Sequence, residues 1–242
     1  MTLPLDGLLV IDFSQFLSGP LCALKLADLG ARVIKIERPG VGDLCRSLYI
    51  SDTEIGGTNS LFHAINRNKE SFTADLRDAG DRAMVTELLA RADVVMQNFR
   101  PGVMERLGLG PDECLGANPR LVFGRMTGWG QTGPLANAAG HDINYLSLSG
   151  ALHAIGEPGG KPVVPLNLVA DCGGGAMLLV VGVLAALLEA RTSGQGQVVD
   201  AAMTDGSALL MTMMYTLKAM GDWTQQRGSN LLDGGAHFYD TY

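Results

Sequence analysis

The sequence has few charged residues, and their signs are unbalanced. Charged side chains make up 18% of the 242 residues and the formal net charge is −7, whereas soluble domains usually carry about a quarter of charged residues. Binding to nucleic acid needs a positively charged patch that faces the phosphates, so this composition argues against a nucleic-acid partner. A small phosphorylated ligand is not excluded, because it needs only two or three local cations.

Several common site signatures are also absent. The four cysteines, Cys22, Cys45, Cys114 and Cys172, are scattered and contain no C-x-x-C pair. We therefore expect neither a metal site nor a disulfide framework, and free thiols are typical of a reducing compartment. The first strand–helix turn lacks G-x-G-x-x-G, which argues against a nicotinamide cofactor, and no P-loop, G-x-S-x-G or H-E-x-x-H is present.

The N-terminus has no basic segment followed by an apolar one, so it does not resemble a signal peptide. The most apolar stretch, residues 176–188, is about 13 residues long. A helix that spans a bilayer needs roughly 20 such residues. We therefore predict a buried core helix, no membrane partner and a cytoplasmic location.

Apolar residues make up 47% of the sequence, enough to fill a substantial core. Short apolar runs alternate with helical segments, and this spacing predicts an α/β fold with a Rossmann-like parallel sheet flanked by helices. The predicted strands are 8–13, 32–37, 71–76, 93–97, 121–126 and 197–201, and the predicted helices are 21–29, 78–92, 103–107, 171–191 and 203–219. Residues 40–70 are expected to be irregular, and residues 236–242 alternate like a strand.

Two segments are candidates for chemistry. Residues 140–145 place four polar side chains just before an apolar stretch, although a surface His141 beside a helix capped by Asp142 explains that composition better. Asp171 stands at the expected N-cap of the helix 171–191, where an aspartate contributes roughly 1 kcal/mol without any catalytic role. The same helix start, with its three following glycines, also offers free N–H groups to an oxyanion. Only the tertiary fold can bring His141 and Asp171 together.

Four segments together resemble the α-methylacyl-CoA racemase family, within the family III CoA-transferase superfamily. They are residues 140–150 (GHDINYLSLSG), 165–171 (PLNLVAD), 192–203 and 227–235. The resemblance spans essentially the whole sequence and is strongest from Arg125 onward. It implies the large domain of that fold, an acyl-CoA substrate that carries its own coenzyme A, no further cofactor, no metal, and a homodimer.

The resemblance also implies a reaction and a site. Such an enzyme interconverts (R)- and (S)-2-methylacyl-CoA thioesters: one base removes the α-proton, and the conjugate acid of a second base returns a proton to the opposite face. The two bases would be His141 and Asp171. The expected contacts to substrate and coenzyme A are Arg38, Ala74, Asp75, Leu76, Arg77, Gly140, Asp142, Tyr145 and Asn167, with Arg100 as a further candidate for the phosphates.

The sequence departs from that family in two ways. His237 stands where racemases usually have proline, and the chain stops where a linker to a second, smaller domain should begin. We therefore expect a large domain over residues 1–235 and the start of a linker over 236–242. The absent small domain would carry a glutamate that pairs with the catalytic histidine.

Two other functions stay open. In a family III CoA-transferase, Asp171 would be a nucleophile that forms an aspartyl-CoA intermediate, and the segment 65–69 looks more like a transferase than a racemase. A non-catalytic remnant would bind acyl-CoA without exchanging a proton. A histidine base at position 141 favours the racemase, because a transferase does not need one.

Overall fold

The computed structural model describes residues 2–48 and 52–241, and the chain folds as two compact units. Unit 1 comprises Met1–Thr127 and Ala176–Ala201, and unit 2 comprises Gly128–Gly175 and Ala202–Tyr242. Each unit is thus built from two separate stretches of sequence. The segment 1–235, predicted as one domain, contains parts of both units.

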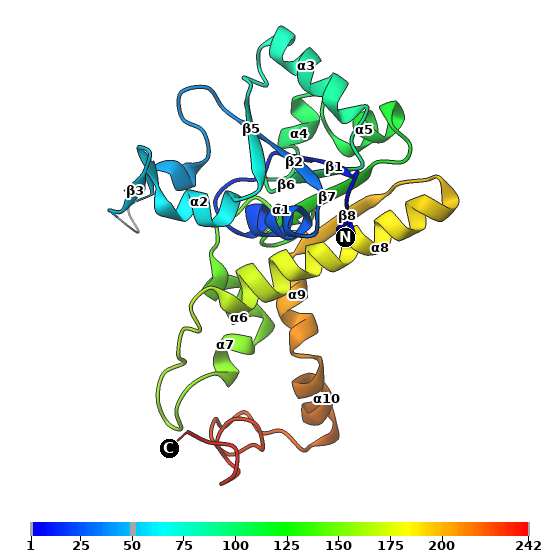
Figure 1. Ribbon diagram of the computed structural model, residues 1–242. Helices are drawn as coiled ribbons and strands as arrows, with labels where there is room; N and C mark the ends of the chain where they lie inside the picture. The colour runs from blue at the N-terminus through cyan, green and yellow to red at the C-terminus, as the bar shows by residue number, and fades with distance from the viewer. Residues whose placement is uncertain (1, 49–51, 242) are drawn as a thin grey trace. The chain divides into compact units, whose positions relative to one another are not determined.

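Unit 1 is built on a six-stranded sheet with the strand order β5-β2-β1-β6-β7-β8 (Figure 1). The strands are β1 (Leu9–Asp12), β2 (Arg32–Glu37), β5 (Lys69–Thr73), β6 (Val94–Gln97), β7 (Val122–Thr127) and β8 (Val198–Ala202). The four pairs from β5 to β7 are all parallel, and the predicted α/β class is confirmed. The strand order reverses between β1 and β6. In open sheets of this type, ligands bind outside the carboxyl ends of the strands at such a switch point.

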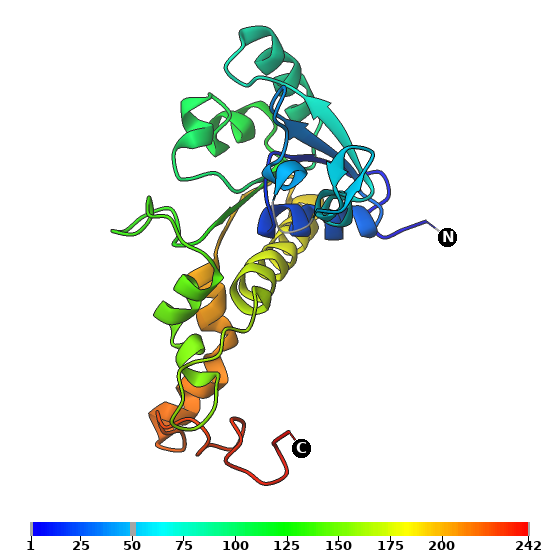
Figure 2. The ribbon, with the colours of Figure 1, turned by 90° about the vertical axis from the view of Figure 1, so that its left-hand side faces the viewer.

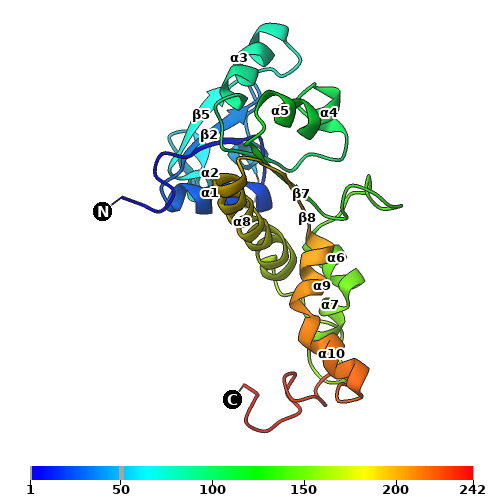
Figure 3. The same ribbon diagram turned by 90° about the vertical axis from the view of Figure 1, so that its right-hand side faces the viewer.

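Helices cover both faces of this sheet (Figures 1 and 3). On one face lie α1 (Ser18–Asp28) and α8 (Leu178–Ser193), and on the other lie α3 (Ala79–Leu89), α4 (Val103–Arg106) and α5 (Pro111–Ala117). Because both faces are covered, the central strands are apolar rather than alternating, and all of β6 is buried. The main core joins Ile11, Val95 and Phe123 of the sheet to Leu89 and Met104 of the helices.

The helix ends in unit 1 follow from local chemistry. Asp78 accepts hydrogen bonds from the N–H groups of Gly80 (2.8 Å) and Asp81 (2.9 Å) and so caps α3. Gly194 ends α8 with φ of +76°, and its N–H donates to the carbonyl of Ala190 (3.0 Å). A residue with a side chain is strained in that left-handed conformation, which is why glycine stands there.

Unit 2 is helical. Its elements are α6 (Asp142–Ser149), α7 (Ala151–Ala154), most of the π-helix η2 (Leu168–Met177), α9 (Met203–Leu210) and α10 (Thr212–Met220). The green α6 and the orange α9 lie side by side (Figure 2). Between the helices, a small core gathers Tyr145, Leu146, Ala151 and Ala170.

Glycines allow η2 and α9 to cross in close contact. A Cβ atom added at Gly174 would lie 2.7 Å from the backbone nitrogen of Ser207, and one added at Gly206 would overlap the carbonyl oxygen of Gly174. Backbone meets backbone at this crossing, and a side chain would push the helices apart. Close packing therefore explains Gly174 within the run Gly173–Gly175.

Three predicted elements differ from the structure. Residues 40–70 contain a 3₁₀ turn (Leu44–Ser47), the pair β3 (Glu54–Ile55) and β4 (Thr58–Asn59), and α2 (Ser60–Asn66), whose N-cap is Asn59. The helix 203–219 is divided at Met211, where ψ of 4° interrupts the hydrogen-bond ladder. Residues 236–241 form turns and bends rather than a strand, and residue 242 lies outside the described residues.

The apolar helix is longer than predicted. Helical structure runs from Leu168 to Ser193, 26 residues, and its most apolar 18-residue window has a mean hydropathy of 2.0. By length and composition alone this helix is able to cross a membrane, and a third of that window (33%) is buried in the structure. The α8 part contacts α1 and β7 in unit 1.

Candidate active site

His141 immediately precedes α6, and its side chain is exposed. Its N–H donates a hydrogen bond to Asn144 Oδ1 (2.9 Å), and its carbonyl accepts one from the Asn144 N–H (2.9 Å). The backbone of His141 is therefore fixed while its ring faces outward. The short helix is present, but His141 is the N-cap and Asp142 is the first helical residue, whereas Asp142 was predicted as the cap.

The loop before α6 packs against Tyr145. The rings of Trp129 and Tyr145 meet edge to face, with 4.7 Å between their centroids. A Cβ atom at Gly140 would lie 2.7 Å from the Tyr145 ring, and one at Gly128 would overlap that ring. Both glycines are required for this packing. The packing therefore explains why glycine stands at position 140, in addition to its predicted place beside the substrate.

Asp171 lies in the first turn of η2, also in unit 2. Its pKa is raised to about 6, first because the carboxyl group is partly buried and second because the charge of Asp142 is near. The neighbouring His141 and a hydrogen bond from Asn167 act in the opposite direction. The fold therefore brings His141, Asn167 and Asp171 within electrostatic reach of one another. The raised pKa brings the titration of the Asp171 carboxyl group closer to neutral pH.

Asp142 joins the start of α6 to the start of η2. Its Oδ2 atom accepts two hydrogen bonds, from the N–H groups of Ala170 and Asp171, each 2.9 Å long. Asp142 itself is buried, with 5% of its surface exposed. The Asp142 carboxylate is thus engaged with the backbone of η2.

Two expectations about Asp171 are therefore wrong. Asp171 is not an N-cap, because the helix begins three residues earlier, at Leu168. The N–H groups of Ala170 and Asp171 are not available to an oxyanion, because both donate to Asp142. The sequence pattern placed the helix start too late because the π-helical turns from Leu168 to Met177 do not follow the 3.6-residue period on which the prediction relied.

Unit 1 holds a separate cavity of about 390 Å³ at the carboxyl ends of the strands. It is lined by Phe13 and Gln15 after β1, by Arg38 after β2, by Ala74, Asp75, Leu76 and Arg77 after β5, and by Phe99 after β6, among others. The structure thus gathers five predicted coenzyme A contacts in one pocket. Residues 74–77 follow β5 rather than form a strand, because Lys69 and Glu70 already pair with β2.

The pocket also contains residues that sequence reasoning missed. Gln15 and Phe99 lie in the loops after β1 and β6, the two strands that flank the switch point. The strand order, once known, points to these loops. Arg100, predicted beside Phe99, is exposed and is not part of the lining.

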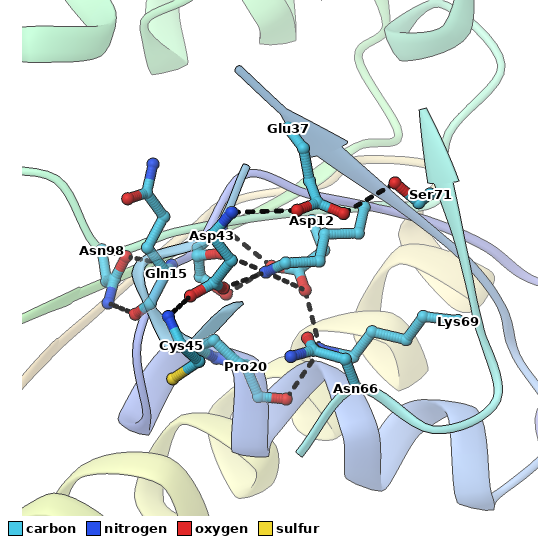
Figure 4. A network of polar contacts seen from close by, with 12 residues as sticks. Asp12, Gln15, Pro20, Glu37, Asp43, Cys45, Asn66, Lys69, Ser71 and Asn98 are labelled. Atoms are coloured by element: carbon cyan, nitrogen blue, oxygen red, sulfur yellow. Dashed lines mark hydrogen bonds and ion pairs between the residues drawn. The ribbon is translucent and has the colours of Figure 1, made fainter. Parts of the chain in front are cut away.

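A buried network of charges lies beneath the pocket (Figure 4). Lys35 Nζ is 2.7 Å from Asp43 Oδ2 and donates to the Ser14 carbonyl (2.6 Å). Lys69 Nζ donates to Asp12 Oδ2 (2.9 Å). The side chains of these two lysines and two aspartates are at most 2% exposed, and their charges cancel.

The same network shapes the turn that carries Gln15. Asp43 Oδ1 accepts from the Phe16 N–H (3.1 Å), and Asn98 bonds Gln15 twice, through the Gln15 N–H (2.9 Å) and carbonyl (2.7 Å) (Figure 4). Phe16 has φ of +71°, a conformation that costs a bulky residue about 1–3 kcal/mol. The surrounding hydrogen bonds hold this strained turn at the edge of the pocket.

Other features of the described residues do not add to this site. A larger cavity, about 440 Å³, lies among turns in unit 2, and its lining includes neither His141 nor Asp171. Across residues 2–48 and 52–241, no group of three or more His, Cys, Asp or Glu side chains is arranged to hold a metal ion. The candidate residues are therefore His141, Asp142 and Asp171 in unit 2 and, separately, the residues that line the pocket in unit 1.

The chain is similar to known proteins over nearly its whole length. The α-methylacyl-CoA racemase of Mus musculus is 42% identical over 238 residues, which are 98% of this chain and 58% of that protein. The acetyl-CoA:oxalate CoA-transferase of Acetobacter aceti is 40% identical, over 98% of this chain and 59% of that protein. A crystal structure of a CAIB/BAIF family protein from Brucella suis matches with a TM-score of 0.86 and 34% identity, over 93% of this chain and 60% of that chain.

The fold is an α/β sheet with a pocket at its switch point, and unit 2 holds a partly buried carboxyl group, Asp171, with a raised pKa. The sequence profile of CoA-transferase family III matches residues 5–242. The chain therefore belongs to CoA-transferase family III, as the resemblance predicted. It spans a little under three fifths of the length of the curated relatives compared above.

Proposed function

We propose that this chain carries the acid/base site of a racemase that interconverts (R)- and (S)-2-methylacyl-CoA thioesters. The observation that carries the proposal is the pairing of His141 and Asp171 within unit 2, with the Asp171 pKa at about 6. The similarity to an α-methylacyl-CoA racemase supports the same reaction. Acyl-CoA is the substrate, and a homodimer is the expected assembly.

In this mechanism each base serves one face of the α-carbon. Ionised Asp171 removes the α-proton of one enantiomer, and the electron pair moves onto the thioester oxygen to give an enolate. Protonated His141 then returns a proton to the opposite face; the reverse reaction exchanges the two roles. The raised pKa of Asp171, about 6, suits general acid/base catalysis. No redox change occurs, so the reaction needs no redox cofactor.

The enolate oxygen needs hydrogen-bond donors. The N–H groups of Ala170 and Asp171 already donate to Asp142. The first N–H groups of a helix have no partner within it. In the first turn of α6 the Asn144 N–H donates to the His141 carbonyl, so we assign the N–H groups of Asp142 and Ile143 to the enolate oxygen.

The pocket of unit 1 is the proposed site for the nucleotide part of coenzyme A. Arg38 and Arg77 line it together and are both exposed, and a guanidinium group suits phosphate because it donates two parallel hydrogen bonds. Arg77 is held by Asp75 through contacts of 3.1 Å. The apolar side chains of Ile36, Leu76 and Phe99 provide the surface for the adenine ring.

Exchange of the α-proton in heavy water tests the reaction. With a 2-methylacyl-CoA and no acceptor acid, the chain should exchange the α-proton and racemise the substrate, and His141→Ala and Asp171→Ala should each lower the rate of racemisation at least about 100-fold, the usual contribution of a general acid or base. His153→Gln changes an exposed histidine of the same unit and should leave the rate unaltered. Racemisation that persists in His141→Ala would contradict the two-base mechanism.

A CoA-transferase is the second candidate, because the acetyl-CoA:oxalate CoA-transferase of Acetobacter aceti is almost as similar. Asp171 would then attack the thioester carbonyl and carry the acyl group, and later coenzyme A, as a covalent intermediate. Turnover would depend strictly on an acceptor carboxylic acid and would survive the loss of His141. If the chain binds acyl-CoA but neither exchanges nor transfers, it is a binding protein only.

A further inference from the structure

We propose that Asp142 is a positioning residue for Asp171: its carboxylate holds the backbone of Asp171, and its negative charge sets how readily Asp171 takes up a proton. The proposal rests on the proposed role of Asp171 in proton transfer. It gives the Asp142 carboxylate a task within the protein.

The first part of the proposal follows from the hydrogen bonds. One oxygen, Asp142 Oδ2, accepts from two consecutive N–H groups, those of Ala170 and Asp171, both at 2.9 Å. Asp142 belongs to α6, whose next turn contributes the buried Tyr145 and Leu146 to the core of unit 2. The carboxylate is thus held by a packed helix and fixes the two peptide groups that directly precede the Asp171 Cα.

The second part follows from the other oxygen. Asp142 Oδ1 is buried and has no hydrogen-bond partner among residues 2–48 and 52–241. No lysine or arginine forms an ion pair with Asp142 in the same part of the chain. A buried carboxylate without a cation exerts its negative charge on its neighbours, and it disfavours a second negative charge nearby.

The groups that face Asp171 agree with this account. Burial and the Asp142 charge raise the Asp171 pKa to about 6, while His141 and Asn167 oppose them. Tyr145 and Cys172 are the other titratable groups in contact with this charge. Burial, and then the two aspartates, raise the pKa values of both, so both stay neutral at pH 7. On α9, which crosses η2, Asp205 is exposed and offers a matched control.

A titration of the Asp171 carboxyl group by ¹³C NMR tests the proposal. The chain is labelled at the aspartate carboxyl carbons, and the Asp171 signal is identified by its loss in Asp171→Asn. Asp142→Asn keeps an oxygen for the two N–H groups but removes the charge. It should lower the titration midpoint of Asp171 from about 6 by about one pH unit, because the like charge is gone. Asp205→Asn, which removes the same charge from the surface of unit 2, should leave the midpoint unchanged.

An unchanged Asp171 midpoint in Asp142→Asn would overturn the proposal, as would a midpoint near 4 in the unaltered chain. The second result needs no variant, so the test holds even if Asp142→Asn does not fold. Asp142→Glu keeps the charge and should keep the midpoint near that of the unaltered chain. The titration requires no turnover. A chain that shows these midpoints but no α-proton exchange would therefore contradict the proposed function and leave the role of Asp142 standing.

Discussion

A lysine with 1% of its side chain exposed is tolerated only when its charge is neutralised. Lys35 meets this condition through Asp43, 2.7 Å away. Lys35→Met should destabilise the chain by about 3–5 kcal/mol, because it leaves one buried carboxylate unpaired. Urea denaturation measures this loss. Arg32→Met on the same strand is the control: its ion pair with Glu70 is 63% and 57% exposed, so it should cost no more than about 1 kcal/mol.

Glu37 links stability to acid pH. Burial raises its pKa, but hydrogen bonds from Arg46 and Ser71 and the Asp43 N–H outweigh burial and lower the pKa to about 2 from the usual 4.5. The folded state therefore gains stability above pH 4.5, and this gain is lost as the pH falls from 4.5 towards 2. Unfolding measured across that range should show a decline that Glu37→Gln reduces. An equally steep decline in the variant would contradict the assignment.

The ionisation of Asp171 affects the stability of the folded state in the opposite direction to that of Glu37. Its folded pKa, about 6, lies above the usual 3.8, so its ionisation opposes folding progressively between pH 3.8 and 6 and fully above pH 6. Asp171→Asn should therefore stabilise the chain at pH 7 to 8 and have little effect at pH 4, while abolishing proton exchange. Thermal unfolding of both chains at the two pH values measures this difference. A variant that is less stable at pH 8 than the unaltered chain would show that the carboxylate has a structural role.

At the scale of elements, the crossing of η2 and α9 depends on two glycines. Gly206→Ala places a methyl group against the Gly174 carbonyl, and backbone cannot rotate away as a side chain can. We expect a loss of about 1–3 kcal/mol or more in the free energy of unfolding, as for other overpacked sites. Gly116→Ala in α5, where an added Cβ meets nothing within 4 Å, should instead stabilise the chain by about 0.5–1 kcal/mol.

Elements with a regular period were predictable from the sequence, and irregular ones were not. The strands β1, β2, β6 and β7 are rich in apolar residues because both sheet faces are covered, and each was predicted within two residues of its bounds. The helix α2 and the π-helix η2 lack the apolar 3.6-residue period that identifies a helix. Because the start of η2 was not predicted, Asp171 was placed at the N-cap rather than in the first turn of its helix. The residue itself was identified.

At the scale of the whole molecule, coenzyme A alone should stabilise the folded chain. A ligand present at 100 times its dissociation constant adds about 2.7 kcal/mol to the free energy of unfolding. Arg38→Ala should reduce this gain, whereas Arg100→Ala should not, since Arg100 is outside the pocket lining. Denaturation with and without coenzyme A measures both effects. Equal loss of the gain in the two variants would contradict the assigned pocket.

The division into two units was not predictable from local patterns. Each unit combines segments that are distant in sequence. The boundaries after Thr127 and Gly175 lie at glycine-rich segments, 128–134 and 173–175, but the boundary after Ala201 falls inside β8. Similarly, the sequence separates His141 from Asp171 and Arg38 from Leu76. The resemblance to a family predicted that these residues lie together. In the structure, Asp142 bonds the backbone next to Asp171 in unit 2, and Arg38 and Leu76 line one pocket at the carboxyl ends of the strands in unit 1.

The buried charges also constrain how the sequence can evolve; they are those of Lys35, Lys69, Asp12 and Asp43. Replacing any one of the four leaves a charge without a counterpart in a site that water does not reach, so most single replacements would be lost before a compensating one arose. The four positions should accordingly be inherited together. In a lineage where one lysine has become apolar, an aspartate of the set should have become neutral as well.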